Sequence, residues 1–349
     1  MQPVHRIELP REVIVGENVI NLSGDVAKRL NLRSILVVTG EHTYHIAGER
    51  VVDVMRGAGR AIDYVVVRES TMSEVYRVQE KIMELRPDAV AGVGGGKIID
   101  VAKLSSANRS VPFLSIPTTA SHDGTTSPFA SIKGRKRPYS VKAHAPIAVI
   151  ADTAIIGRAP YKFTASGCGD IMAKYTAVRD WRLAHRRKGE YYSEYAAELA
   201  LMSAELIMRH ARAIRKSVEG SVRMVVKALI SCGVAMSVAG SSRPCSGSEH
   251  LFSHALDFLA PRPALHGEQC GMGTIVMAKL HGLNWRFVRE RLRAIGAPTT
   301  ADEIGIQPRD IVRALAYAVK IRPERYTILN ERSLTEETAR RLVEETGVA

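Results

Sequence analysis

Short apolar runs alternate with segments of helical periodicity over about the first 150 residues. In the segments at residues 73–85 and 98–107, apolar side chains recur at helical spacing; Ser73 is placed to cap the first segment and Pro87 to end it. Apolar runs that alternate with helices predict a parallel sheet with helical crossovers, an architecture typical of nucleotide-binding proteins. The apolar runs lie at residues 35–40, 62–67, 89–93, 113–117 and 147–152.

The pattern changes in the second half of the chain. Residues 130–141 have the alternation of a β-hairpin whose basic tip, residues 133–137, we interpret as solvated surface. From about residue 160 strand signals nearly vanish, and apolar positions recur at helical spacing. We therefore predict an N-terminal Rossmann-like α/β domain, residues 1–157, followed by an all-α domain, residues 158–349. The helical signals are strongest at residues 192–208, 222–239 and 311–318.

Charge and composition narrow the classes of partner. Lysine and arginine exceed aspartate and glutamate by 13, which favours anionic partners such as nucleic acid, membrane surfaces or phosphorylated small molecules. Aromatic residues make up only 5%, which leaves little material for stacking bases. No apolar run approaches the ~18 residues of a membrane helix, and no apolar segment follows Met1, so we expect a cytoplasmic protein. The four cysteines form no CxxC pair, which argues against a disulfide framework or a four-thiolate zinc site.

A glycine-rich loop, Gly94-Gly95-Gly96-Lys97, follows one predicted strand and opens a helix that contains Asp100. Glycines let backbone N–H groups approach a phosphate, and the N-terminus of a helix favours an anion. The loop matches neither the Walker A pattern nor GxGxxG. A phosphate- or dinucleotide-binding loop and a tight structural turn both remain open.

Two further segments are polar. Residues 117–127 follow the next strand and supply four threonines, two serines and Asp123, either as ligand contacts or as a loop that caps itself. Residues 167–170, with Asp170 last, stand at the head of a helical segment, where the carboxylate is either a functional group or an N-cap.

Three histidines lie close in the sequence. His250 and His254 are spaced i and i+4, which puts them on one helix face, and His266 follows a proline-containing bend. Two histidines and one carboxylate are a common catalytic zinc shell. A packed or surface pair of histidines is the alternative.

The order of these motifs resembles the superfamily of glycerol dehydrogenase, dehydroquinate synthase and the iron-containing alcohol dehydrogenases. Within it the chain is most similar to the sn-glycerol-1-phosphate dehydrogenase family, on residues 246–257 and 264–271 above all. The resemblance implies a dehydroquinate synthase-like fold, with dinucleotide binding in residues 1–157 and metal and substrate binding in residues 158–349.

The resemblance also implies roles for single residues. Asp170, His250 and His266 match the ligands of one Zn²⁺; Asp123 and His254 match catalytic and substrate-binding positions, and Asp170 matches a substrate contact too. In some glycerol dehydrogenases the ligand aligns with the second histidine of such a pair, so His254 stays an alternative to His250. The positions that match contacts to NAD(H) or NADP(H) are Gly94, Gly95, Gly96, Lys97, Asp100, Thr118, Thr119, Ser121 and Ser127.

The implied reaction is the reduction of dihydroxyacetone phosphate by NADH or NADPH, which supplies the glycerophosphate backbone of archaeal membrane lipids. The resemblance also implies a homo-oligomer, a dimer or larger, that acts on a small phosphorylated substrate. It implies neither binding to nucleic acid nor insertion into a membrane. A polyol dehydrogenase acting on an unphosphorylated substrate is the nearest alternative. Dehydroquinate synthase is less expected because its metal carboxylate is typically glutamate, and a nucleic-acid-binding protein using the basic residues 133–142 and 186–188 is remote. The sequence does not indicate which lysine or arginine holds the phosphate.

Overall fold

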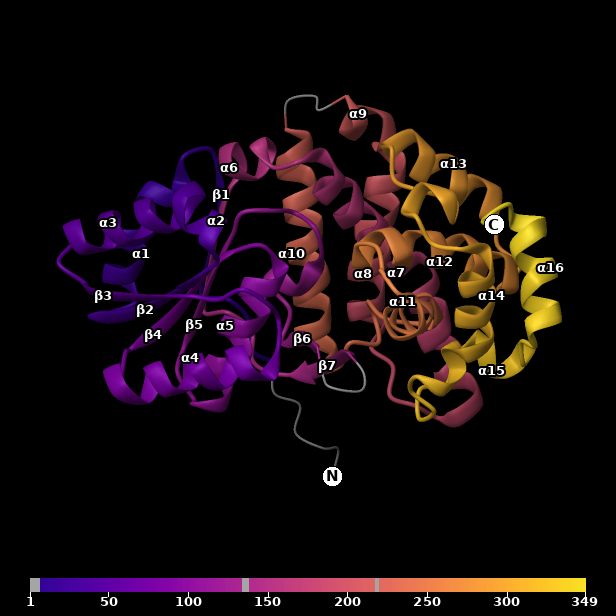
Figure 1. The fold of residues 1–349 in the computed structure, drawn as a ribbon, viewed down its shortest axis with the longest axis horizontal. Helices are drawn as coiled ribbons and strands as arrows, with labels where there is room; N and C mark the ends of the chain where they lie inside the picture. The colour runs from indigo at the N-terminus through magenta and orange to yellow at the C-terminus, as the bar shows by residue number, and fades with distance from the viewer. Residues whose placement is uncertain (1–6, 134–137, 217–219) are drawn as a thin grey trace. The chain divides into compact units, whose positions relative to one another are not determined.

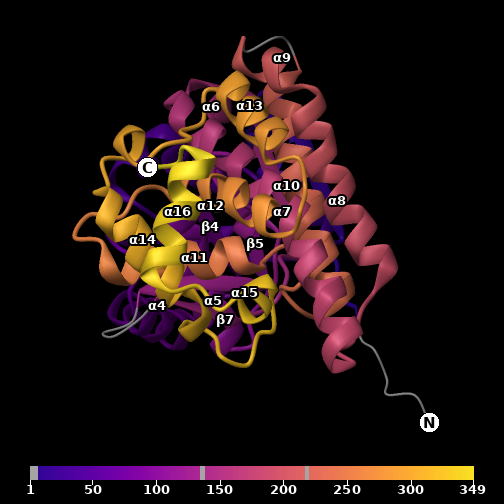
Figure 2. The same ribbon diagram turned by 90° about the vertical axis from the view of Figure 1, so that its right-hand side faces the viewer.

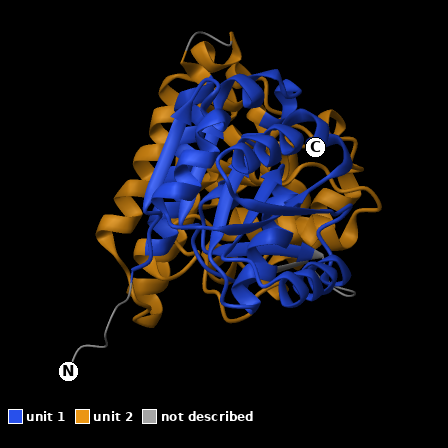
Figure 3. Cartoon of the chain, turned by 90° about the vertical axis from the view of Figure 1, so that its left-hand side faces the viewer, with its two compact units in different colours: residues 1–163, 222–237 blue, residues 164–221, 238–349 orange. Residues whose placement is uncertain are grey.

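The computed structural model describes residues 7–133, 138–216 and 220–349, so residues 134–137 of the predicted hairpin tip lie outside the described residues. The chain forms two compact units (Figure 3): Met1–Phe163 with Val222–Ser237, and Thr164–Ser221 with Val238–Ala349. This division differs from the single boundary after residue 157 that the sequence suggested, because Val222–Ser237 belongs to the first unit.

Unit 1 contains a six-stranded, all-parallel sheet in the order β1-β8-β5-β4-β2-β3 (Figure 1). The predicted parallel sheet is thereby confirmed. Strand β1 was not predicted. It is an edge strand that, within the described part of the chain, pairs with β8 alone, and it has no clear alternation of buried and exposed positions. The strands are β1 (Glu12–Gly16), β2 (Ser34–Thr39), β3 (Ala61–Val66), β4 (Ala89–Gly94), β5 (Phe113–Pro117) and β8 (Ala148–Asp152), with the antiparallel hairpin β6 (Phe129–Lys133) and β7 (Pro138–Lys142).

Both faces of the inner strands of this sheet are buried. In β2, Ile35 and Val37 belong to a core with residues of α1 and α3, whereas Leu36 and Val38 belong to a second core with residues of α4 and α5. Successive side chains of a strand point to opposite faces, so a strand covered on both sides is apolar throughout. The helices of this unit are η1 (Val19–Leu22), α1 (Ser23–Arg29), α2 (Glu41–Thr43), η2 (Tyr44–Gly48), α3 (Glu49–Gly57), α4 (Met72–Leu85), α5 (Gly96–Asn108), η3 (Asp123–Thr125) and α6 (Thr153–Arg158).

The start of α4 corrects one prediction. Thr71, not Ser73, is the N-cap, and its hydroxyl accepts a hydrogen bond from the Glu74 N–H. The helix ends at Leu85, two residues before Pro87, as predicted, because a residue that precedes proline disfavours the helical conformation.

Helix α10 (Ser221–Ala239) is long and apolar enough to cross a membrane by length and composition. More than half of its apolar window is buried, and Val226 and Leu229 line the same small cavity as Pro117 of β5 and Val149 of β8. Packing within unit 1 therefore accounts for its apolar character. The helical pattern of residues 222–239 predicted a place in the C-terminal domain, whereas Val222–Ser237 belongs to unit 1. An apolar helix fits either core, so the pattern alone carries no signal for one unit.

Unit 2 is built of helices (Figure 2), as predicted for the C-terminal part. Helix α11 packs against α12 and α14, and α12 packs against α13. The helices are α7 (Tyr161–Lys188), α8 (Glu194–Arg209), α9 (Ala211–Arg215), α11 (Ser248–Leu259), α12 (His266–Leu280), α13 (Trp285–Ile295), η4 (Asp302–Ile304), α14 (Pro308–Tyr317), η5 (Ala318–Lys320), α15 (Ile328–Arg332) and α16 (Glu336–Thr346).

Candidate active site

Two glycines bring α7 and α12 into close contact within unit 2. A Cβ on Gly169 would lie 2.2 Å from the carbonyl oxygen of Gly267, and a Cβ on Gly267 would lie 1.9 Å from that of Ser166. Gly169 precedes Asp170 and Gly267 follows His266, so this contact places the carboxylate beside the imidazole. Asp170 is buried inside α7, and the expectation that it stands at the head of a helix, where it might be an N-cap, was wrong.

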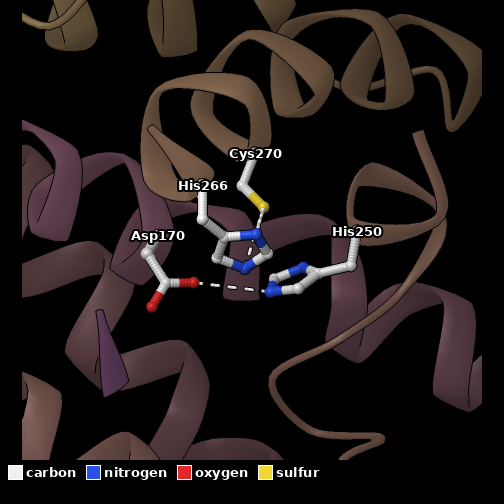
Figure 4. Close-up of side chains that lie close together, drawn as sticks. All are labelled: Asp170, His250, His266 and Cys270. Atoms are coloured by element: carbon white, nitrogen blue, oxygen red, sulfur yellow. Dashed lines mark hydrogen bonds and ion pairs between the residues drawn. The ribbon is translucent and has the colours of Figure 1, made fainter. Parts of the chain in front are cut away.

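Asp170, His250, His266 and Cys270 converge from α7, α11 and α12 (Figure 4). One ligand atom from each lies within 4.8 Å of the others. Nε2 of His250 is 3.4 Å from Oδ1 of Asp170, and Sγ of Cys270 is 3.5 Å from Nε2 of His266. The structure thus brings together the three residues predicted as metal ligands and adds a thiol.

A carboxylate orients the ring of His250. Oε1 of Glu249, which is fully buried, lies 2.9 Å from Nδ1 of His250. The backbone N–H of Gly247 donates to the same oxygen, and the hydroxyl of Thr176 donates to the other oxygen at 2.8 Å. With Nδ1 engaged by the carboxylate, Nε2 is directed toward Asp170, the arrangement found around most metal-binding histidines.

Lys174 compensates the charge of Asp170. Its Nζ lies 2.7 Å from Oδ1 of Asp170, one helical turn away, and both side chains are buried. Burial by itself would raise the pKa of Asp170, but the ammonium group of Lys174 and the hydrogen bond from His250 hold it well below the usual range. The carboxylate is therefore charged at neutral pH, as metal binding requires.

His266, the first residue of α12, is held in the neutral form. Burial and the positive charge of His250 lower the pKa of His266 to about 3. Its Nδ1 lies 3.1 Å from the Ser253 hydroxyl. Burial also raises the pKa of the Cys270 thiol, which makes this sulfur a weak ligand because only the thiolate binds metals well.

His254 lies one turn along α11 from His250 and outside the group of four. Its ring stacks on that of His266 with centroids 5.8 Å apart, and Nδ1 lies 3.7 Å from Oδ2 of Asp257. Burial lowers the pKa of His254 against the opposing effect of Asp257. The geometry groups His250, and not His254, with Asp170 and His266, and leaves His254 as an imidazole beside the cluster.

The donor set fits a zinc ion. Two atoms bound to one tetrahedral zinc at about 2.1 Å stand about 3.4 Å apart, which is the separation of the nearest atoms of Asp170 and His250. The set also has the composition typical of a catalytic zinc site: the carboxylate of Asp170, the neutral imidazole of His266, and the imidazole of His250, which contacts a second carboxylate through its other nitrogen.

The predicted cofactor residues lie in unit 1, at the carboxyl ends of β4 and β5. Gly94 pairs in register with Pro117, and the N–H of Thr118 donates to the Gly94 carbonyl, so the two loops meet. Between β2 and β4 the chain leaves the sheet in opposite directions, and ligands of open α/β sheets bind at such a point.

The glycines of the loop have different packing. A Cβ on Gly94 would lie 2.7 Å from Ile98, and one on Gly96 would lie 1.7 Å from Nε2 of His122. A Cβ on Gly95 would meet nothing closer than the Thr119 hydroxyl at 3.4 Å. Packing therefore explains two of the glycines, and Gly95 is the position where a ligand has room.

Two predicted cofactor contacts point in different directions. Lys97 is exposed in the first turn of α5, whereas Asp100 is buried and accepts a hydrogen bond from the Ser131 N–H of β6. Oδ1 of Asp100 lies 3.5 Å from Nζ of Lys103, and burial raises the pKa of Asp100. Asp100 thus ties α5 to the hairpin.

The loop after β5 presents several hydroxyls. Thr118 is buried, and among the described residues its Oγ1 has no hydrogen-bond partner, which suits a polar ligand. Oγ1 of Thr119 lies 3.4 Å from Oγ of Ser121, and Ser127 is buried against Phe129. Asp123, half-buried at the start of η3, belongs to this unit and not to the unit of the metal ligands.

Sequence reasoning missed Lys174, Glu249 and Cys270. Glu249 directly precedes a predicted ligand, and Lys174 and Cys270 each follow one by four residues. The i,i+4 spacing that linked His250 and His254 could have identified Lys174 and Cys270.

Comparison with known proteins places the chain in a family. Residues 14–160 match the family model described as iron-containing alcohol dehydrogenase. The chain is 56% identical over 346 residues to glycerol-1-phosphate dehydrogenase [NAD(P)+] of Thermococcus kodakarensis, and the match covers 99% of each chain. It is 52% identical to the enzyme of the same name from Methanothermobacter thermautotrophicus, over 98% of this chain and 99% of the relative. In fold it resembles glycerol dehydrogenase from Schizosaccharomyces pombe, with a TM-score of 0.82, 20% identity and coverage of 99% of this chain and 91% of that one. Similarity at this level along the whole chain shows that the protein belongs to the glycerol-1-phosphate dehydrogenase family.

Proposed function

We propose that this protein is an NAD(P)-dependent dehydrogenase that reduces dihydroxyacetone phosphate to sn-glycerol 1-phosphate with one Zn²⁺ per subunit. The observation that carries the proposal is the cluster of Asp170, His250 and His266 in a chain whose full-length relatives are named for that activity. Zinc, when bound, supplies a Lewis acid that stabilises negative charge on the substrate oxygen.

In this mechanism the residues of unit 2 hold and orient the reacting ketone. Asp170, His250 and His266 would hold the metal, while Glu249 fixes the ring of His250. Because Lys174 already compensates Asp170 and His266 is neutral, the cluster keeps a net positive charge toward the developing alkoxide.

His254 is the residue we assign to proton transfer. Its lowered pKa keeps the imidazole neutral at pH 7, and in the direction of alcohol oxidation a neutral imidazole accepts the hydroxyl proton. The reverse transfer supplies the proton during ketone reduction. Asp123 is proposed as a further contact to the substrate.

The reduced cofactor is proposed to bind along Gly94–Gly96 and the hydroxyl loop of unit 1. The N-terminus of α5 carries no side-chain cap, so its first backbone N–H groups would be available to the pyrophosphate. Both NADH and NADPH are proposed donors, as the relatives' names imply. The resemblance implies further contacts to the cofactor, from Lys97, Asp100 and the hydroxyls of Thr118, Thr119, Ser121 and Ser127.

The wider assignment follows from the same proposal. We place the enzyme in the cytoplasm, as a homo-oligomer that supplies the glycerophosphate backbone of archaeal membrane lipids. Residues 1–157 would form the dinucleotide-binding domain and residues 158–349 the metal- and substrate-binding domain. Val222–Ser237 would pack with the first of these domains.

The test measures NADH and NADPH oxidation with dihydroxyacetone phosphate and with dihydroxyacetone, on zinc-loaded protein. The expected result is a strong preference for the phosphorylated ketone, which a chelator abolishes and Zn²⁺ restores. A preference for dihydroxyacetone would instead make the protein a polyol dehydrogenase. Oxidation with neither ketone would refute both assignments.

A further inference from the structure

A second buried carboxylate on α7 accepts hydrogen bonds from several segments of unit 2. Asp180 is fully buried, and its Oδ2 accepts from the N–H of Ser248 at 2.7 Å and from the Ser248 hydroxyl at 2.6 Å. Its Oδ1 accepts from the Ile328 N–H at 2.7 Å and lies 3.0 Å from Nε2 of His281. A carboxylate offers about four acceptor positions, so Asp180 is saturated by the protein itself.

The donors to Asp180 stand at the ends of helices. Ser248 is the first residue of α11, whose N-terminus has no side-chain cap of its own, and Ile328 is the first residue of α15. His281 directly follows α12. Negative charge is favourable near the N-terminus of a helix. Asp180 therefore joins α7, α11 and α12, which are the helices that carry the three proposed metal ligands.

The start of α11 lies closely on α7. A Cβ on Gly247 would be 2.8 Å from Cα of Ala177 and 2.6 Å from Oδ2 of Asp180, so only a glycine allows the two segments to approach this far. Ser248 follows and is held by Asp180, and His250 comes two residues later in the same turn. The position of this turn relative to α7 thus depends on Asp180.

Asp180 and Glu249 fix different features of the site. Glu249 contacts the ring of His250 and orients it, whereas Asp180 holds the backbone of the turn from which that ring extends. Among the described residues, no hydrogen bond or ion pair joins Asp180 to a proposed ligand. A binding site has to hold its groups to within about 0.5 Å. A shift of α11 along α7 would change the 3.4 Å separation of His250 Nε2 and Asp170 Oδ1 directly.

We propose that Asp180 is a positioning residue of the metal site. By holding the first turn of α11 and the end of α12 against α7, it keeps His250 at binding distance from Asp170. This assignment rests on the proposed function, because the metal is part of that proposal.

The variant Asp180→Asn tests this role with almost no change in side-chain size. Both oxygens of Asp180 accept from a backbone N–H, one from Ser248 and the other from Ile328. In either orientation, therefore, the NH₂ group of asparagine would meet a backbone donor and leave it without an acceptor. The first turn of α11 or of α15 would have to move.

Asp152→Asn is the matched control, because the buried carboxylate of Asp152 is held in the same way in unit 1. Its Oδ1 accepts from the N–H groups of Ala154 and Ile155 at the start of α6, and its Oδ2 accepts from the Ile20 N–H. Both oxygens again accept from the backbone, so the same substitution disturbs a helix start that carries no metal ligand.

Zinc affinity is measured by competition with a coloured chelator, well below the thermal midpoint of each variant. The visible absorption spectrum of the Co²⁺-loaded protein reports the geometry around the metal. In Asp180→Asn the zinc affinity should fall at least about tenfold, and the Co²⁺ bands should shift. Asp152→Asn should lower the thermal midpoint but keep the zinc affinity and the spectrum of the wild type.

A second variant decides the question if Asp180→Asn does not fold. His281→Leu removes the donor at the end of α12 and leaves the bonds of Asp180 to the backbone in place. It should weaken zinc binding at least about threefold.

Contrary results separate this assignment from the proposed function. If the wild type binds zinc, and the folded Asp180→Asn protein, or His281→Leu in its place, keeps the same affinity and Co²⁺ spectrum, the role of Asp180 is refuted and the proposed function stands. An equal loss of zinc affinity in Asp180→Asn and Asp152→Asn would also refute it, because the effect would then be one of general stability. If the wild type itself binds no zinc, the proposed function fails, and this assignment fails with it.

Discussion

Oε1 of Glu249 lies 2.9 Å from Nδ1 of His250 and so orients the ring of a proposed metal ligand that it adjoins in sequence. Thr176 of α7 and the Gly247 N–H hold the same carboxylate, so the ring is fixed by groups from two segments. Glu249 thus serves to orient the His250 ring, a role that its position in the sequence does not indicate.

Replacing Glu249 by glutamine should weaken zinc binding about 10- to 100-fold, because the charge that supports the His250 ring is lost. Competition with a coloured chelator measures this affinity. Glu337→Gln, at an exposed site on α16, is the control and should bind zinc normally. Unchanged affinity in Glu249→Gln would mean that the carboxylate serves packing only.

Lys174→Met should destabilise the metal-free protein by about 3–5 kcal/mol, since Asp170 would remain buried without its cation. Added zinc should restore much of this loss by supplying positive charge to the same oxygen. Urea unfolding with and without zinc measures both effects. Lys279→Met removes a partly exposed pair with Glu345 and should cost at most about 1 kcal/mol. Equal losses in the two variants would contradict the charge argument.

The stability of the metal-free protein should fall as pH drops below about 6.5. His266 has a folded-state pKa of about 3, so between these values the unfolded chain binds a proton that the folded protein does not. Each such proton contributes a slope of about 1.4 kcal/mol per pH unit. The free energy of unfolding, measured with urea at pH 5 and at pH 7, should differ less between the two pH values for His266→Asn than for wild type. An exposed-site variant, His42→Asn, should follow the wild type; equal slopes in all three would refute this origin of the pH dependence.

Gly96→Ala should weaken NADH binding at least about tenfold without loss of zinc, because its Cβ would collide with the ring of His122 and displace the loop. Fluorescence titration of NADH and metal analysis separate the two effects. Gly57→Ala, whose Cβ meets nothing within 4 Å, is the control. The double variant Gly96→Ala/His122→Ala should recover part of the affinity; no loss in the single variant would separate this glycine from the cofactor.

Much of the fold could be predicted because its elements have strong local patterns. The inner strands β2, β4, β5 and β8 are buried on both faces and form continuous apolar runs. The i,i+4 pair of histidines was correctly placed on one helix. The start of α7 was misjudged for a physical reason: Gly167 and Gly169 resemble the boundary of a helix, yet they lie inside one. The small size of Gly169 serves a contact with another helix, and a contact between distant segments leaves no local signal.

The three residues predicted as ligands lie together in the structure, whereas the groups that support them were not predicted. Lys174 and Glu249 act through Asp170 and His250, and their roles depend on burial that no single position discloses. The order of motifs could indicate the candidate metal ligands, whereas only the packed helices show what keeps those residues in place.

The contact between Gly169 and Gly267 has a consequence for how mutations in this protein are interpreted. Each glycine adjoins a proposed ligand, so the distance between the two helix backbones sets the distance between the carboxylate and the imidazole of the proposed metal site. A methyl group added at either position changes no donor atom, yet it would enlarge the opening between Asp170 and His266. In a random-mutation screen for lost activity, alanine at these glycines would be indistinguishable from loss of a ligand. An engineer who wants a larger ion in the site would begin with these two positions.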